Sequence, residues 1–92
     1  MIRSFRDKDA RALFEGKSVR RYRAIVKQAQ NRLQYLNAAM TLADLAARPS
    51  NRFENLAGDR KGQCSIRINE QWRLVFRWTE DGAEDVEIVD YH

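Results

Sequence analysis

The stretch QCSIRINEQWRLVFRWT, residues 63–79, contains two runs in which apolar and polar side chains alternate one by one. The apolar members of the first run are Cys64, Ile66 and Ile68, and those of the second are Trp72, Leu74, Phe76 and Trp78. Alternation with a period of two is typical of β-strands, because successive side chains point to opposite faces. The polar triplet at residues 69–71 separates the runs and favours a tight hairpin turn. We therefore expect an antiparallel hairpin with one apolar face rich in aromatic side chains.

The residues that follow this hairpin predict one more strand. Residues 79–84 contain Gly82 and are typical of a second turn. Val86 and Ile88 then alternate with polar neighbours, which predicts a last strand over residues 86–91. The C-terminal half of the chain is thus expected to form an antiparallel meander.

The residues before the hairpin have the spacing of helices. No Gly or Pro interrupts residues 19–40, where apolar side chains recur every three or four positions and predict one continuous helix. The members of this stripe are Tyr22, Ile25, Val26, Ala29, Leu33, Leu36 and Met40. Thr41 and Asp44 have the spacing of a capping box for a further short helix, which Pro49 and Ser50 end.

The start of the chain predicts a short strand over residues 2–5 and then a helix. Asp7 is a suitable N-cap for that helix, and Gly16 ends it. The complete order is a short N-terminal strand, two to three helices and an antiparallel sheet, which predicts an α+β fold. In that fold the helices pack on one face of the sheet, so that the aromatic face of the hairpin meets the helical stripe. Residues 1–92 are enough for a single domain.

The composition is typical of a soluble globular protein. Hydrophobic residues make up 43% and charged residues 33%, and no run reaches the roughly 18 apolar residues that span a bilayer. Charged residues close to Met1 argue against a signal peptide. Cys64 is the single cysteine, so it forms no internal disulfide, and we expect its side chain to be buried. These features favour a cytoplasmic protein.

The net charge of +4 is unevenly distributed along the chain. Residues 1–52 hold 12 Lys and Arg against 4 Asp and Glu, while residues 53–92 hold 5 against 9. A basic face suits a polyanion such as nucleic acid, and Arg20, Arg23 and Lys27 are candidates for that contact. In the alternative interpretation these side chains only form the solvent-exposed face of a helix.

Three arginines share the polar face of the predicted hairpin, namely Arg67, Arg73 and Arg77. Neighbouring strands lie about 4.8 Å apart, so their guanidinium groups can converge on one anionic group. Arginine binds phosphate through a planar fork and stays charged at any relevant pH. In the alternative interpretation the same arginines form cross-strand ion pairs with Glu87.

The last three residues, Asp90-Tyr91-His92, combine a carboxylate, a phenol and an imidazole. All three groups can move protons in catalysis, and His92 is the only histidine of the chain. Terminal residues are usually dispensable, which is the alternative interpretation. Because these three directly follow an apolar strand, we expect them to be held in place.

The combination of motifs resembles the HigB-like toxins of the RelE/ParE superfamily. The similarity rests on Leu56-Ala57-Gly58-Asp59-Arg60-Lys61-Gly62, on Ser65-Ile66-Arg67, on Asn69 and Trp72-Arg73-Leu74 with Phe76, and on Asp90-Tyr91-His92. Each motif alone is weak, but their order and spacing are specific, and the resemblance covers essentially the whole chain.

The resemblance implies a RelE-like compact domain that is the toxin of a type II toxin–antitoxin system. Such toxins are mRNA endonucleases of the ribosomal A site. They use no metal or other cofactor and activate the ribose 2′-hydroxyl for attack on the adjacent phosphate. The implied partners are the ribosome with its mRNA and a HigA-like helix-turn-helix antitoxin. The toxin would contact operator DNA only through this antitoxin. No membrane is implied.

The resemblance also implies roles for individual residues. Asp90, Tyr91 and His92 match the terminal catalytic group, and Arg73 matches an arginine that faces the scissile phosphate. Glu54 occupies a position where some of these toxins carry a catalytic histidine. Either Glu54 replaces that base, or the site uses the terminal residues alone.

The glycine-flanked turn at residues 58–62 is a weaker candidate. It lacks the spacing of a phosphate-binding P-loop, and turn geometry accounts for its two glycines. Arg60 and Lys61 in this turn are nevertheless candidates for contacts with RNA phosphates.

Two other functions are compatible with parts of the sequence. A non-catalytic ParE-like toxin that inhibits DNA gyrase shares the fold but does not need titratable groups at residues 90–92. A general RNA-binding domain needs exposed aromatic side chains for stacking, whereas most aromatics here lie on the core-facing side of the predicted elements.

Overall fold

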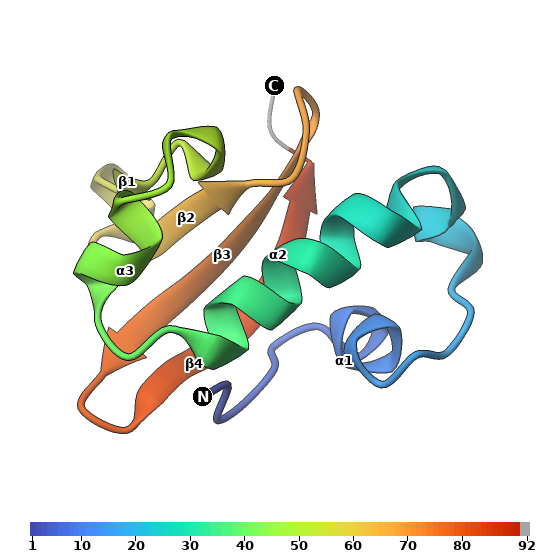
Figure 1. Cartoon of the computed structure of the whole chain (residues 1–92), viewed down its shortest axis with the longest axis horizontal. Helices are drawn as coiled ribbons and strands as arrows, with labels where there is room; N and C mark the ends of the chain where they lie inside the picture. Colours follow the sequence, from blue (N-terminus) through green and yellow to red (C-terminus); the bar gives the residue numbers. More distant parts are fainter. Residues whose placement is uncertain (91–92) are drawn as a thin grey trace.

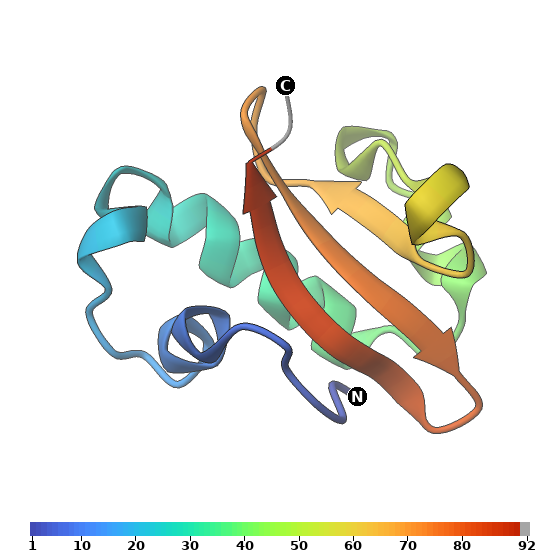
Figure 2. The same cartoon turned by 180° about the vertical axis from the view of Figure 1, so that it is seen from behind.

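The computed structural model describes residues 1–90 and has the expected α+β architecture. The helices are α1 (Lys8–Phe14), α2 (Val26–Ala38) and α3 (Leu42–Ala46), with 3-10 turns η1 (Arg20–Ile25), η2 (Pro49–Asn51) and η3 (Gly58–Arg60). The strands are β1 (Glu54–Asn55), β2 (Cys64–Arg67), β3 (Trp72–Thr79) and β4 (Gly82–Asp90). α2 lies across one face of the sheet (Figure 1), and the view from behind shows the opposite face (Figure 2).

The sheet is an antiparallel meander in the order β1-β2-β3-β4. The predicted hairpin is confirmed as β2 and β3. Its turn is held by Asn69, whose side-chain oxygen accepts hydrogen bonds from the backbone N–H groups of Gln71 and Trp72, both at 2.8 Å. The short edge strand β1 was not expected, because two residues are too few to show a periodic pattern.

A β-bulge interrupts the pairing of β3 with β4. Glu84 pairs with Arg77 and Glu87 pairs with Val75, so Asp85 and Val86 together stand opposite the one residue between them on β3. Asp85 adopts a φ of 55°, a left-handed conformation that aspartate tolerates better than most residues.

The N-terminal segment runs beside β4 but does not form the regular strand that residues 2–5 predict. Among residues 1–90, the segment instead forms two isolated parallel bridges, between Ile2 and Ala83 and between Phe5 and Val86. Between these bridges the segment has no regular strand pairing, and the Ser4 hydroxyl accepts a hydrogen bond from the backbone N–H of Asp85 in the bulge. Gly82 is required here, since a Cβ at that position would collide with the carbonyl oxygen of Met1.

The prediction of one continuous helix over residues 19–40 is wrong. A 3-10 turn, η1, precedes α2, and Tyr22 and Ile25 have non-helical backbone angles. This break lets the Tyr22 hydroxyl donate to the carboxylate of Asp7 at 3.0 Å and its ring meet that of Trp72 edge-on at 5.5 Å. Burial, followed by the bond to Asp7, raises the pKa of Tyr22.

The prediction that the helix and its apolar stripe extend to Met40 is also wrong. α2 ends at Ala38, and Met40 is 85% exposed. The chain leaves the helix because the expected capping box of α3 forms: the backbone N–H of Asp44 donates to the Thr41 hydroxyl, and the Asp44 carboxylate accepts from the N–H groups of Met40 and Thr41. The predicted N-cap Asp7 is confirmed for α1.

The core lies between α2 and the face of β3 that carries the aromatic alternation, as expected. Leu74 and Phe76 are completely buried there, and Trp72 and Trp78 are partly buried against the same cluster. Cys64 is buried as well, which raises the pKa of its thiol.

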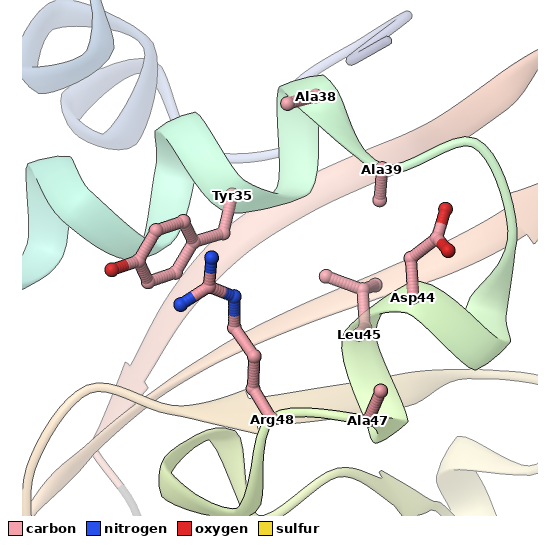
Figure 3. Close-up of a pocket in the computed structure, with 7 residues that line it drawn as sticks. All are labelled: Tyr35, Ala38, Ala39, Asp44, Leu45, Ala47 and Arg48. Atoms are coloured by element: carbon pink, nitrogen blue, oxygen red, sulfur yellow. The ribbon is translucent and has the colours of Figure 1, made fainter.

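A hollow of about 430 Å³ lies between α3 and the C-terminal part of α2 (Figure 3). At one end the guanidinium of Arg48 stacks on the Tyr35 ring, with its central carbon 4.1 Å from the ring centroid. Most of the other lining residues are apolar, and the carboxylate present, that of Asp44, caps α3. This hollow therefore offers little chemistry of its own.

Candidate functional site

The face of the sheet opposite α2, termed here the open face, carries rows of residues paired across the strands. One row consists of Glu54, Ser65, Val75 and Glu87, each aligned with the next. The next row contains Arg67, Arg73 and Val89. Cross-strand partners share a face and have Cβ atoms about 5 Å apart, so the two rows place acidic, hydroxyl and basic side chains side by side.

Arg73 is the centre of this arrangement and is buried, with 7% of its surface exposed. Its Nε donates to the hydroxyl of Ser65 at 2.8 Å, and its Nη2 donates to the backbone carbonyl of Arg52 at 2.6 Å. Arg73 is thus buried although it lies on the polar face of the hairpin. The chain after η2 turns back through a left-handed residue, Arg52 with φ 44°, and brings its carbonyl over the guanidinium.

Glu54 on β1 places a carboxylate beside Arg73. Its Oε1 lies 3.5 Å from the Arg73 Nη2, and half of the Glu54 side chain, 51%, is exposed. β1 thus positions a solvent-exposed carboxylate next to a guanidinium that is held by Ser65 and the Arg52 carbonyl. The arrangement can hold a phosphate group at Arg73 with a proton acceptor next to it.

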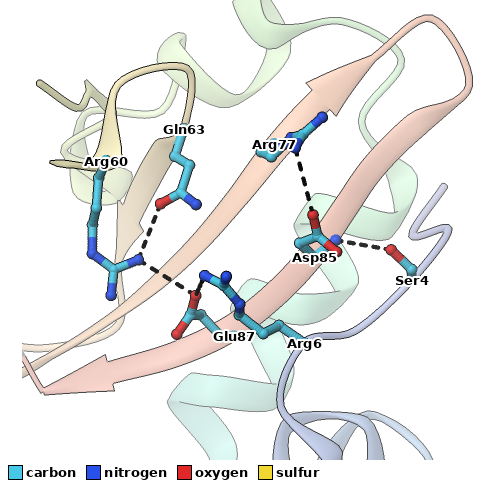
Figure 4. Close-up of polar contacts among 7 residues, drawn as sticks. All are labelled: Ser4, Arg6, Arg60, Gln63, Arg77, Asp85 and Glu87. Atoms are coloured by element: carbon cyan, nitrogen blue, oxygen red, sulfur yellow. Dashed lines mark hydrogen bonds and ion pairs between the residues drawn. The ribbon is translucent and has the colours of Figure 1, made fainter.

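A second group of charges surrounds Glu87 on the open face (Figure 4). The carboxylate of Glu87 accepts from Arg6 at 3.3 Å and from Arg60 at 3.4 Å, and Arg60 also donates to Gln63. The alternative in which Glu87 pairs with the strand arginines is wrong, because its partners come from the N-terminal segment and from η3. Lys61, which follows η3, is exposed.

Arg77 does not join Arg73 and Arg67 at one anion. It lies four residues along β3 from Arg73, roughly 13 Å at the rise of a strand, and beyond the bulge. Its guanidinium faces Asp85 at 3.9 Å (Figure 4). Convergence of all three arginines on one group is therefore wrong, whereas Arg67 and Arg73 are direct cross-strand partners.

The chain matches the model of a known family over residues 3–92, described as the RelE-like toxin of the type II toxin-antitoxin system HigB. This chain belongs to the HigB-like toxin family. Toxin HigB-1 of Vibrio cholerae serotype O1 is 40% identical over 87 residues, covering 90% of each chain. Endoribonuclease HigB of Proteus vulgaris is 32% identical over 93 residues and covers 100% of both.

A solved structure supports the fold of this HigB-like chain. It is the YoeB-YefM complex from Staphylococcus aureus, with a TM-score of 0.61 at 20% identity, covering 100% of this chain and 95% of that chain. The expected RelE-like α+β fold is thereby confirmed.

The terminal residues expected in the site of this HigB-like toxin are placed only in part. Asp90 pairs with Trp72 and accepts a hydrogen bond from the Gln71 side chain at 3.1 Å, so it stands at the end of β4 beside the start of β3. Tyr91 and His92 lie outside the residues that the structure describes.

The expected basic contacts on the helices lie in a different layer from Arg73. Arg20 and Arg23 on η1 and Lys27 on α2 are exposed. They belong to the helical layer and not to the open face. Within residues 1–90, no cluster of three or more His, Cys, Asp or Glu is suited to hold a metal ion, and no helix there is both long and apolar enough to cross a bilayer.

Two site residues were missed from the sequence. Ser65 shares the parity of Arg67, so its place on the open face was predictable, although its bond to Arg73 was not. Arg52 contributes a backbone carbonyl, and such a contact leaves no side-chain signal in the sequence.

Proposed function

We propose that this toxin is an endoribonuclease that cleaves mRNA in the ribosomal A site, with residues 1–92 acting as one toxin domain. The observation that carries this proposal is the Arg73–Glu54 pair on the open face, a buried cation 3.5 Å from an exposed carboxylate. Membership of the HigB-like family, and a relative named as an endoribonuclease, support the same activity.

Arg73 would bind the scissile phosphate and stabilise the extra charge of the phosphorane-like transition state. A guanidinium suits this role because it offers several N–H donors in one plane and stays charged. Ser65 and the Arg52 carbonyl hold the group before substrate arrives. Such preorganised contacts typically contribute about 10²–10³ in rate.

Proton transfer would involve Glu54 and His92. Glu54 takes the proton of the ribose 2′-hydroxyl, the 2′-oxygen forms a bond to phosphorus, and the bond from phosphorus to the 5′-oxygen breaks. The departing 5′-oxygen receives a proton from the His92 imidazolium. The products are a 2′,3′-cyclic phosphate and a 5′-hydroxyl, and the scheme uses no metal or other cofactor.

The remaining expected residues would support this reaction. Tyr91 would stack on a base, and Asp90 would orient the imidazole. Contacts with mRNA or ribosomal RNA phosphates fall to the open-face cations Arg60, Lys61, Arg67 and Arg77 and to the helical cations Arg20, Arg23 and Lys27. Phosphate contacts of this kind position RNA without reading its sequence.

The proposed cellular setting follows from this activity. The toxin would act in the cytoplasm, where ribosomes are, and would be neutralised by a HigA-like helix-turn-helix antitoxin. Operator DNA would be contacted through that antitoxin.

The test is primer extension on a defined mRNA after induction of the toxin, repeated with purified toxin and translating ribosomes. Cuts within the A-site codon that disappear in the Arg73→Ala variant are expected. Growth arrest with intact mRNA and with broken chromosomal DNA would instead identify a ParE-like inhibitor of DNA gyrase.

A further inference from the structure

A hollow of about 430 Å³ opens at the edge of the sheet where β2 ends. β1 pairs with only the first part of β2, so the rest of that edge faces α2 and η2 instead of a strand. The lining includes Arg32 from α2, Ser50 and Arg52 from the η2 segment, and Arg67 and Asn69 from the end of β2 and its turn. The volume is in the range of about 300–1,000 Å³ that small-ligand sites occupy.

The hollow is positively charged and its charge is not balanced locally. Among the described residues, its lining holds three arginines and no carboxylate. None of Arg32, Arg52 and Arg67 forms an ion pair with a carboxylate of residues 1–90. Arg6, Arg60 and Arg77, in contrast, have acidic partners (Figure 4). Arg73 likewise pairs with Glu54. The hollow is therefore a favourable place for an anion.

The polar groups of the hollow are mainly donors. Arg32 Nε donates to the backbone carbonyl of Arg67 at 2.8 Å, which ties this guanidinium to the end of β2. The amide oxygen of Asn69 is engaged by two backbone N–H groups, so its NH₂ group is the part left to donate. Phosphate oxygens accept hydrogen bonds and carry negative charge, which matches this lining.

The hollow is connected directly to the Arg73 site. Arg67 is the cross-strand partner of Arg73, and the carbonyl of Arg52 accepts from the Arg73 guanidinium at 2.6 Å. We propose that the hollow binds a second phosphate of the RNA backbone, adjacent to the phosphate at Arg73. The proposal rests on the function assigned above, because it takes Arg73 as the site of the scissile phosphate.

The test compares RNA binding by the parent toxin and by the double variant Arg52→Gln/Arg67→Gln. Both substitutions keep the backbone carbonyls that Arg73 and Arg32 use. The probe is a short, fluorescently labelled single-stranded RNA with 2′-O-methyl riboses, which the toxin cannot cleave. Losing charge-assisted contacts should weaken binding about tenfold. The slope of log affinity against log salt should fall by about 0.7, the amount for one phosphate on a single strand.

The matched control is Lys8→Gln/Arg11→Gln on α1, which removes the same charge from exposed positions outside the hollow. This control should keep the parental affinity and salt slope. Parental affinity in the Arg52/Arg67 variant, or an equal loss in the control, would overturn the proposal. The proposal would also be overturned if the Arg52/Arg67 variant kept parental RNA binding but lost affinity for an acidic peptide. That result would assign the hollow to a protein partner.

A cleavage assay on ribosomes separates this proposal from the proposed function. The double variant should need about ten times more toxin for half-maximal cleavage, while its rate at saturation stays parental. A reduced rate at saturation with unchanged half-saturation would contradict a pure binding role. A parent toxin that cleaves no RNA would contradict the proposed function, but the binding measurement would still decide the role of the hollow.

Discussion

The Nη2 of Arg73 lies 3.5 Å from the carboxylate of Glu54, and the two side chains differ sharply in exposure. Arg73 is fixed by hydrogen bonds to a hydroxyl and a carbonyl, whereas Glu54 lies half exposed on the short strand β1. The pair therefore combines a buried, hydrogen-bonded cation with a carboxylate that solvent reaches.

Replacement of Arg73 is expected to impair both cleavage and stability. Arg73→Ala should lower the single-turnover cleavage rate by about 10²–10³, because a transition-state contact is lost. It should also lower the free energy of unfolding by about 1–3 kcal/mol, since the buried Ser65 hydroxyl and the Arg52 carbonyl lose their donor. Arg73→Lys should restore only part of the rate, because an ammonium lacks the planar fork.

The control for this prediction is Arg3→Ala, which removes an exposed arginine to which no contact with RNA is assigned. Cleavage on ribosomes and urea denaturation should both remain close to parental for it. Parental cleavage by Arg73→Ala would show that this arginine does not contact the reacting phosphate.

Glu54→Gln is expected to lower the cleavage rate by about 10²-fold with little change in stability. The amide has nearly the shape of the carboxylate but cannot accept the 2′-hydroxyl proton, and loss of a general base costs about 10²–10⁴. Single-turnover cleavage measures this effect. Glu70→Gln, an exposed change in the hairpin turn, should leave the rate unchanged. A Glu54→Gln toxin as fast as the parent would mean that the proton acceptor is in the terminal residues.

His92→Ala is expected to lower the cleavage rate more than Glu54→Gln does. The reason is that the departing 5′-oxygen is a poor leaving group without a proton. The rate should fall by up to about 10⁴, and added imidazole should restore part of it. Thermal denaturation should give the parental melting temperature. A full-rate His92→Ala toxin, or a loss that imidazole does not reverse together with a lowered melting temperature, would exclude His92 as the acid.

The acid side of the stability profile should depend on Asp44. Backbone N–H groups of Met40 and Thr41 hold the pKa of Asp44 below its ordinary value. A carboxylate with a lowered folded-state pKa stabilises the fold fully above its unfolded pKa, and this contribution disappears as the pH falls through the folded value. Asp44→Asn should therefore be less stable than the parent at neutral pH and equally stable in strong acid. Equal stability at both pH values would contradict a role for the charge.

The extent to which the sequence predicts this structure depends on how local each feature is. The alternation over residues 63–79 is sufficient for the hairpin, because side-chain parity is a property of neighbouring residues. The break at Tyr22 is not visible in the spacing, since this ring is buried in a continuous helix as well as in a broken one. Contacts of Tyr22 with Asp7 and Trp72 decide between them.

The same distinction applies to the site. Parity places Arg67 and Arg73 on the open face, but it does not reveal the loop that buries Arg73, because that loop contributes a main-chain oxygen. The separation of Arg77 from Arg73 follows from strand rise alone and was predictable. The roles of Tyr91 and His92 stay predictions that the proposed variants test.

The bulge at Asp85 and Val86 also constrains how this gene can change. Ala83 and Val86 are an odd number of positions apart, yet both side chains are fully buried, and only the additional residue reconciles them. Deletion of the Asp85 codon would place Ala83 and Val86 an even number of positions apart, so the core-facing side chains of β4 would stay on one face without the bulge. The deletion would, however, remove the backbone N–H of Asp85 that donates to the Ser4 hydroxyl at 2.9 Å. The additional residue thus serves the docking of the N-terminal segment on β4, and selection on that docking maintains it.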